Sequence, residues 1–350
     1  MTDLKSLLDT ELKGWVGEQF EPQYRAGQIL DWIYKKRVKS IDAMSNLPVE
    51  MRKKISEHFV LGNLELVRKQ GSADTTQKFL WKLADGQMIE SVLIPANPAL
   101  YGETSDRHTL CVSSQVGCAY GCKFCASGLD GWKRNLLPDE IVGQVMAAEE
   151  HGGHKVNNIV FMGMGEPLSN YNNLLKAIRI LNAEWGVGIG ARKMTLSTSG
   201  LVPEIKRLAQ EPQQIRLAIS LHGATDETRD KIMPVNKKYP LEELLGACRE
   251  YLKFRSQMIT FEYILIAGVN DSPADADALG KICRNLKVKV NLIPYNKVDG
   301  LEWTRPTEAR QIAFAEKVRS YDVTATLRLE KGHDIDAACG QLRLQEMKSA

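Results

Sequence analysis

The sequence predicts an α/β fold: a partial parallel (β/α) barrel, preceded by a small helical N-terminal domain and a short β element. From about Thr109 onward, short runs rich in β-branched residues alternate with longer amphipathic stretches such as "PDEIVGQVMAAEEHG" and "LEELLGACREYLKF". This alternation is typical of βαβ units, whose strands lie parallel in one sheet. The chain has 350 residues, 43% hydrophobic and 25% charged, so it is long enough to bury a large core.

The chain divides into three stretches. Residues 1–63 include "RAGQILDWIYKKRV" and "PVEMRKKISEHF", where apolar residues recur at helical spacing beside basic ones, so we expect a helical domain. Residues 64–100 include "KFLWKLADGQMIESVLIP", whose strand-like runs flank the turn sequence "ADG" and predict a small antiparallel element or linker. Residues 101–350 carry the alternating pattern and are expected to form the barrel and a C-terminal loop.

The barrel is expected to use most of the short β-branched segments that follow Thr109. These segments are "TLCVSS", "NIVFM", "KMTLSTS", "IRLAISL", "MITFEYILI", "KVNLI" and "VTATLRL". Ligands of such folds bind at the carboxyl ends of the strands. Polar residues that directly follow these segments are therefore candidates for a binding site.

Composition argues against a secreted or membrane protein. The segment "MTDLKSLLDTELKGW" carries charges throughout, without the apolar stretch of a secretory signal. The longest apolar run, "YILIAGV", is far shorter than the roughly 20 residues that span a membrane. We therefore expect a cytoplasmic protein with no membrane contact. Its seven cysteines then point to metal binding or catalysis rather than to structural disulfides.

Cys118, Cys122 and Cys125 form a C-x3-C-x2-C pattern on a loop that follows the first barrel strand. Three thiolates on one short loop can hold three irons of a cubane cluster and leave the fourth iron open for another ligand. Zinc also accepts thiolates, but a closed structural zinc site needs four ligands and usually has two C-x2-C pairs. The spacing therefore favours an iron–sulfur cluster over zinc.

This cysteine pattern, with the aromatic Phe124 before the last cysteine, resembles the signature of radical S-adenosylmethionine (SAM) enzymes. The resemblance implies one 4Fe-4S cluster held by Cys118, Cys122 and Cys125. It also implies that the open iron binds the amino and carboxylate groups of SAM. An electron from the cluster would then cleave SAM to a 5′-deoxyadenosyl radical.

Polar residues at the ends of later strands fit a SAM site. Glycines in "GMGEP" would let the backbone approach a ligand, and a carboxylate there could face an ammonium group. Each residue also has a simpler interpretation as a capping serine, a core histidine or a turn residue. The candidates are Gly165, Glu166, Ser197, Ser220, Leu221, His222 and Asn296.

The C-terminal "GHDIDAACGQL" places Cys339 in a glycine-flanked loop. With "CVSSQVGCAYGCKFCASG", "GMGEPL", "YRAGQILDWIYKK" and "SNLPVEMR", it resembles the RlmN family over nearly the whole chain. These dual-specificity methyltransferases methylate C2 of an adenosine in 23S rRNA, at the peptidyl-transferase centre, and in tRNA, 3′ of the anticodon. The related Cfr enzymes methylate C8 of the same ribosomal adenosine, and motifs alone do not separate the two reactions.

The resemblance also implies a mechanism with two SAM molecules per turnover. Cys339 would take a methyl group from one SAM, and a radical derived from the second would activate this methyl group for attack on the adenine. Cys111 would then displace the methylated RNA by attacking the sulfur of Cys339, which leaves a transient disulfide. Glu90 occupies the position of the suggested base for the C2 proton. The alternatives are a buried strand thiol for Cys111 and an outward-facing strand residue for Glu90.

Basic residues beside aromatic ones suggest contact with RNA, although most short basic runs are solvated helix faces. We further expect a monomer, reduced by an external flavodoxin-type electron donor. A zinc-stapled RNA-binding module without catalysis is the alternative from another class, and it would not need Cys111 and Cys339. The basic and aromatic candidates are Trp32, Tyr34, Lys35, Lys36, Arg37, Lys39, Arg52, Lys53, Lys54, Trp132, Lys133 and Arg134.

Overall fold

The computed structural model describes residues 1–96, 105–129, 131–297 and 301–328. Its main feature is a ten-stranded sheet with the order β14-β13-β12-β11-β10-β9-β6-β5-β4-β3. All seven predicted barrel strands are present, in parallel register with their neighbours. They are β6 (His108–Cys111), β9 (Asn158–Phe161), β10 (Met194–Thr198), β11 (Arg216–Ser220), β12 (Ile259–Leu265), β13 (Val288–Pro294) and β14 (Ala325–Leu327).

Three antiparallel strands extend this sheet beyond β6: β3 (Glu65–Gly71), β4 (Gln77–Lys82) and β5 (Met88–Pro95). The turn between β4 and β5 is tight, because the Gly86 amide bonds the Leu83 carbonyl and Gly86 has a φ of 81°. The element expected between residues 64 and 100 is therefore antiparallel, as predicted. It continues the sheet of the barrel, since β5 pairs directly with β6.

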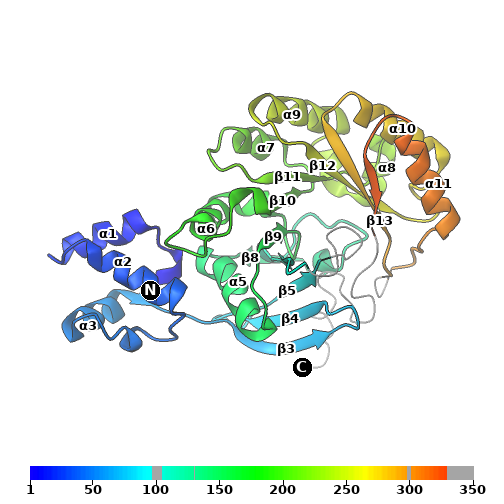
Figure 1. Ribbon diagram of the computed structural model, residues 1–350. Coiled ribbons are helices and arrows are strands. Elements are labelled where there is room, and N and C mark those ends of the chain that lie inside the picture. The colour runs from blue at the N-terminus through cyan, green and yellow to red at the C-terminus, as the bar shows by residue number, and fades with distance from the viewer. Residues whose placement is uncertain (97–104, 130, 298–300, 329–350) are drawn as a thin grey trace.

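Helices cover one face of the parallel strands (Figure 1). The strand residues on this face are apolar; Leu110, Ile159 and Met194 are opposite one another on three adjacent strands, and all are fully buried. The helices are α5 (Pro138–Gly152), α6 (Tyr171–Asn182), α7 (Val202–Ala209), α8 (Asp226–Ile232), α9 (Leu241–Phe254), α10 (Pro273–Arg284) and α11 (Glu308–Arg319).

The other face of the sheet carries polar residues, because side chains alternate between faces along a strand. Ser220, Glu262 and Asn291 are opposite one another on β11, β12 and β13, and Glu262 is only 4% exposed. We call this the inner face of the sheet. Buried polar groups on an otherwise apolar sheet need partners, so the inner face is where a bound ligand is expected.

The N-terminal module consists of α1 (Asp9–Glu18), α2 (Tyr24–Leu30), a π-helical turn (Asp31–Lys35) and α3 (Val49–His58). Figure 1 shows these helices, in blue, on the side of the molecule that carries α5 and α6, away from α10 and α11. Polar contacts hold the module there. The hydroxyl of Ser6 donates to Asp139 at 2.6 Å, and Lys176 bonds Glu11 at 2.8 Å. Among the described residues, no helix is long and apolar enough to cross a membrane.

Candidate active site

The three clustered cysteines lie on a loop closed by a short hairpin. Strands β7 (Gln115–Gly117) and β8 (Trp132–Asn135) pair antiparallel on either side of the loop. At the base of the loop the backbone crosses itself so closely that a Cβ on Gly117 would meet the Gly131 carbonyl oxygen at 1.8 Å. Gly117 also has a φ of 73°. Glycine is therefore required here, and the crossing fixes the direction in which the loop leaves the sheet.

Cys118, Cys122 and Cys125 line one cavity of about 270 Å³ at the carboxyl ends of the parallel strands. The same cavity is lined by five residues predicted from sequence as cofactor contacts, which come from the ends of three different strands. They are Gly165, Glu166, Ser197, Ser220 and His222. The structure therefore brings together residues that are more than 100 positions apart in the chain.

Two predicted contacts lie elsewhere. Leu221 is fully buried and is not among the described residues that line this cavity. Asn296 follows β13 and lines a separate surface cavity together with Tyr295 and Trp303. Asn296 is not among the described residues that line the cysteine cavity.

The thiolate forms of these cysteines need a positive charge nearby. Burial raises the pKa of Cys118 to about 12, and the pKa of Cys122 also lies well above its usual value, first because of burial and then because Cys125 and Cys118 repel its charge. Three thiolates can coexist here only beside positive charge, which iron supplies. Among the described residues, no three potential ligands converge on a point that would hold a single metal ion. Three thiols around one cavity suit a group larger than one ion.

Glu166 is almost fully buried and is bonded to backbone amides. Its carboxylate accepts the amides of Ser199 at 2.7 Å and Leu168 at 3.0 Å, so it ties the loop after β9 to the loop after β10. Burial raises the pKa of Glu166, and these donors act against that shift. A buried carboxylate with several donors is held in one orientation. It can offer a remaining lone pair to an ammonium group in the cavity.

His222 is neutral and fixed in one tautomer. Burial, followed by the charge of Arg229, lowers the pKa of His222 to about 3. The amide of Ile264 donates to its Nδ1 at 3.0 Å, so the proton of the neutral ring lies on Nε2. The ring packs edge-on against Phe124, with 4.8 Å between centroids, and His222 has a φ of 56°. This strained position offers an N–H donor beside the cysteine loop.

Arg229 on α8 holds together the backbone around the cavity, although no motif in the neighbouring sequence predicts this role. Its guanidinium is fully buried and donates to the carbonyls of Ser199 at 3.2 Å, Ser220 at 3.3 Å and Leu221. Burial lowers the pKa of Arg229 to about 10, so the group stays charged at neutral pH. The positive charge also favours thiolate at Cys122.

Glu262 is a second residue that sequence reasoning missed. Its side chain lines the cavity from the middle of β12 and accepts a bond from Asn291 at 3.0 Å. Burial raises the pKa of Glu262, while Arg328 acts against the shift. A signal was present in "MITFEYILI", because a carboxylate within an apolar strand requires a partner or a function.

Cys111 and Glu90 lie on the inner face of the sheet. Cys111 is opposite Val92 on β5 and Val160 on β9, and side chains that are opposite on neighbouring strands share a face. Glu90 precedes Val92 by two positions and therefore shares this face. Val160 is in turn opposite Thr195 on β10. Ser197, two positions after Thr195 on the same face, lines the cavity. Neither Cys111 nor Glu90 is among the described residues that line the cavity itself.

Glu90 forms a buried ion pair with Lys78 on the neighbouring strand β4. The ammonium and carboxylate are 3.0 Å apart, and the side chains are 0% and 3% exposed. Cys339, which sequence reasoning placed in the same chemistry, lies outside the described residues.

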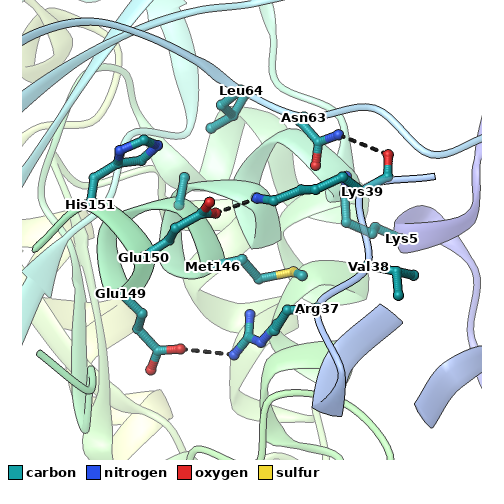
Figure 2. A pocket seen from close by; sticks show the side chains of 12 residues that line it. Lys5, Arg37, Val38, Lys39, Asn63, Leu64, Met146, Glu149, Glu150 and His151 are labelled. Atoms are coloured by element: carbon teal, nitrogen blue, oxygen red, sulfur yellow. Dashed lines mark hydrogen bonds and ion pairs between the residues drawn. The ribbon is translucent and has the colours of Figure 1, made fainter. Parts of the chain in front are cut away.

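Several basic residues expected to contact RNA form ion pairs with acidic residues of the same chain. Figure 2 shows Arg37 and Lys39 reaching across a cavity of about 450 Å³ to Glu149 and Glu150 of α5, and Arg37 bonds Glu149 at 2.8 Å. Arg134 likewise bonds Glu140 and Asp85. Tyr34 is buried, at 3% exposed. The exposed members of the predicted set are Lys35, Lys36, Lys39, Lys53, Trp132 and Lys133.

Comparison with known protein families gives two matches. Residues 112–278 match the model of the radical SAM superfamily, and this range contains the three cavity cysteines. Residues 2–61 match the ribosomal RNA large subunit methyltransferase N-terminal domain. The two matches together span most of the chain.

Similar proteins match over nearly their full length. A probable dual-specificity RNA methyltransferase RlmN from Akkermansia muciniphila is 56% identical over 97% of this chain and 94% of its own length. A second such protein, from Opitutus terrae, is 54% identical over 95% of this chain and 91% of its own. A solved radical SAM methyltransferase from Sphaerobacter thermophilus is 44% identical and superposes with a TM-score of 0.90, covering 97% of this chain and 99% of that one.

Proposed function

Because this chain belongs to the RlmN family of radical SAM RNA methyltransferases, we propose that it methylates C2 of an adenosine in 23S rRNA and in tRNA. The chain is a SAM-dependent enzyme with a 4Fe-4S cluster, and RNA is its substrate class. The relatives reported above are named as RlmN enzymes, which favours methylation of C2 over the Cfr reaction at C8.

One observation supports the proposed mechanism most directly: the cysteine cavity, Cys111 and Glu90 all lie on the inner face of one sheet. A thiol and a carboxylate on that face can act on a substrate held against it. The cluster would be held by Cys118, Cys122 and Cys125. Glu166, Ser197, Ser220 and His222 would orient SAM, which together with the cluster supplies a 5′-deoxyadenosyl radical.

We assign sequential roles to two cysteines. Cys339 would accept a methyl group from one SAM and carry it as a thioether, and the radical supplied by a second SAM would remove a hydrogen atom from that methyl group so that its carbon could add to the adenine. The new carbon–carbon bond tethers the RNA to Cys339. The thiolate of Cys111 would then attack the sulfur of Cys339, so that a sulfur–sulfur bond forms as the sulfur–carbon bond breaks; the bonding pair passes to the carbon attached to the adenine, which takes up a proton to become the methyl group. Reduction of this disulfide regenerates both thiols.

Glu90 is proposed as the base that takes the C2 proton from the tethered adenine. The ammonium of Lys78, at 3.0 Å, holds this carboxylate in place on the inner face that it shares with Cys111. The pair is buried, so water does not compete for the proton acceptor.

The N-terminal module, residues 1–63, is proposed to contact RNA through its exposed surface rather than through Arg37 and Lys39, which bond α5. Residues 64–100 add strands to the sheet that carries Glu90, and residues 101–350 hold the cluster, SAM and both reactive cysteines. We propose that the enzyme acts in the cytoplasm as a monomer and receives electrons from a flavodoxin-type donor.

Nucleoside analysis tests the proposal. The anaerobically reconstituted enzyme, a reductant, SAM and a transcript containing the ribosomal target should yield 2-methyladenosine, detected by mass spectrometry after digestion. A matched transcript with guanosine at the target position is the control. Formation of 8-methyladenosine would replace the proposal with the Cfr reaction. Absence of any methylated adenosine, despite reductive cleavage of SAM, would contradict RNA methylation at this site.

A further inference from the structure

Tyr120 separates the cysteine cavity from a second cavity on the outside of the molecule. The residue belongs to the cysteine loop and lines both the inner cavity, with Cys118 and Cys122, and an outer cavity of about 460 Å³. Its hydroxyl is within hydrogen-bond distance of Ser169 Oγ, at 3.1 Å, which fixes the ring in this position.

The surface around the outer cavity is positively charged. Arg207 and Lys238 line it and are exposed, whereas Glu204 is the one acidic residue among its described lining residues. Lys238 lies close enough to Tyr120 to oppose the rise in its pKa that burial causes. Two further exposed lysines are close in the chain: Lys123 directly follows Cys122 on the cysteine loop, and Lys237 directly precedes Lys238 at the end of a 3-10 turn.

Two aromatic rings of this surface, Tyr171 and Tyr239, already form cation–π contacts with basic residues of the same chain. The guanidinium of Arg207 lies 4.0 Å from the ring centroid of Tyr171, and the ammonium of Lys238 lies 5.2 Å from that of Tyr239. The Tyr171 hydroxyl is bonded to Glu211 at 3.1 Å. RNA recognition commonly stacks bases on such rings. Rings occupied in this way favour a partner that binds through charge rather than through stacked bases.

We propose that this surface, formed by Tyr120, Lys123, Arg207, Lys237 and Lys238, is the docking site for an acidic one-electron carrier protein. The inference rests on the proposed function, because radical SAM chemistry requires an electron from outside. The step moves no atoms: the carrier loses one electron and the cluster gains it. Electron tunnelling weakens steeply with distance, so a carrier docked at Tyr120 would be better placed than one at the inner face, which the substrate occupies.

Charge reversal tests the docking. The double variant Lys237→Glu/Lys238→Glu should raise the Kd for a purified bacterial flavodoxin by at least about tenfold, measured by calorimetry, and wild-type affinity should fall as salt is added. Arg284→Glu is the matched control, because this exposed arginine lies on α10, which packs against α11 rather than against the α7 helix that carries Arg207. Unchanged flavodoxin affinity in the double variant would overturn the proposal.

RNA binding separates the two classes of partner. The double variant should bind a target RNA stem-loop as tightly as wild type does. A loss of RNA affinity with unchanged flavodoxin affinity would assign the surface to RNA and overturn the proposal.

A second variant tests the role of Tyr120 itself. Tyr120→Leu should slow cluster reduction at saturating flavodoxin without changing the Kd, whereas Tyr120→Phe should retain the wild-type rate. Equal rates for all three proteins would exclude Tyr120 from the electron path. SAM cleavage driven by dithionite, a small reductant that needs no docking site, tests the proposed function separately and should persist in the Lys237→Glu/Lys238→Glu variant, because neither lysine is among the described residues that line the cysteine cavity.

Discussion

Cys111 and Cys283 are nearly equally buried, at 7% and 2% exposed, but they lie on opposite sides of the sheet. Cys111 is on the inner face, in register with the strands that line the cysteine cavity. Cys283 lies on α10, in the helical layer, where burial raises its pKa to about 12. Cys248 on α9 also lies in the helical layer, and burial raises its pKa to about 12 as well. The comparison teaches that burial does not separate the thiol that we propose to be reactive from the thiols of the helical layer; the face of the sheet does.

The largest expected effect is on the inner face, at the cysteine loop. Cys118→Ala should abolish cluster binding, because two thiolates no longer hold three irons. Wild-type protein reconstituted anaerobically should contain about four irons per chain and absorb visible light, and the variant should contain almost none. Cys248→Ala, the control from the helical layer, should retain the full iron content. Wild-type protein that takes up zinc but no iron and sulfide would contradict the cluster.

Cys111 and Cys339 are expected to fail in different ways. Cys339→Ala should give neither methylated RNA nor a covalent adduct, since the methyl carrier is missing. Cys111→Ala should still attach RNA to Cys339 but should not release it, so protein–RNA adduct should accumulate on denaturing gels. A packing defect cannot produce this asymmetry, because a cavity lowers stability without creating a crosslink. Methylation by Cys339→Ala, or no adduct with Cys111→Ala, would contradict the mechanism.

Disruption of the Lys78–Glu90 pair should have a large effect on stability as well as on product release. Lys78→Met leaves the carboxylate buried without its cation and should lower the free energy of unfolding by about 3–5 kcal/mol, measured by urea titration. Lys78→Met/Glu90→Gln removes both charges and should recover most of this loss. If the single variant is as stable as wild type, the pair is not buried in solution. The double variant should cleave SAM normally and should still be slow to release RNA, because it lacks the base.

The smallest effect is expected in the helical layer. Cys283→Ala should lower the free energy of unfolding by only about 1 kcal/mol, since a small side chain is lost from an apolar environment. Iron content and RNA methylation should stay at wild-type levels. A variant with normal stability but no methylation would show that a thiol of the helical layer takes part in the chemistry. That result would contradict the distinction between the inner face and the helical layer.

The sequence by itself determined the elements and much of the site. Periodicity gave the seven parallel strands, because β-branched runs between amphipathic helices leave few other arrangements. The cysteine spacing predicted the metal-binding loop, and the strand-end rule identified Glu166, Ser197, Ser220 and His222 as neighbours of that loop. These predictions depend on local pattern and on one topological rule, and both are properties of the chain order.

The tertiary structure alone decided which other groups join the site. Arg229 matters because the carbonyls it bonds come from loops after β10 and β11, and no local pattern shows that those loops converge on α8. Lys78 became the partner of Glu90 through the register of β4 and β5, since a shift by one residue would turn the lysine to the other face. Asn296 follows a strand as the rule requires, yet it lines another cavity, together with Tyr295 and Trp303. Side-chain direction depends on register and on the path of the backbone, which long-range packing sets.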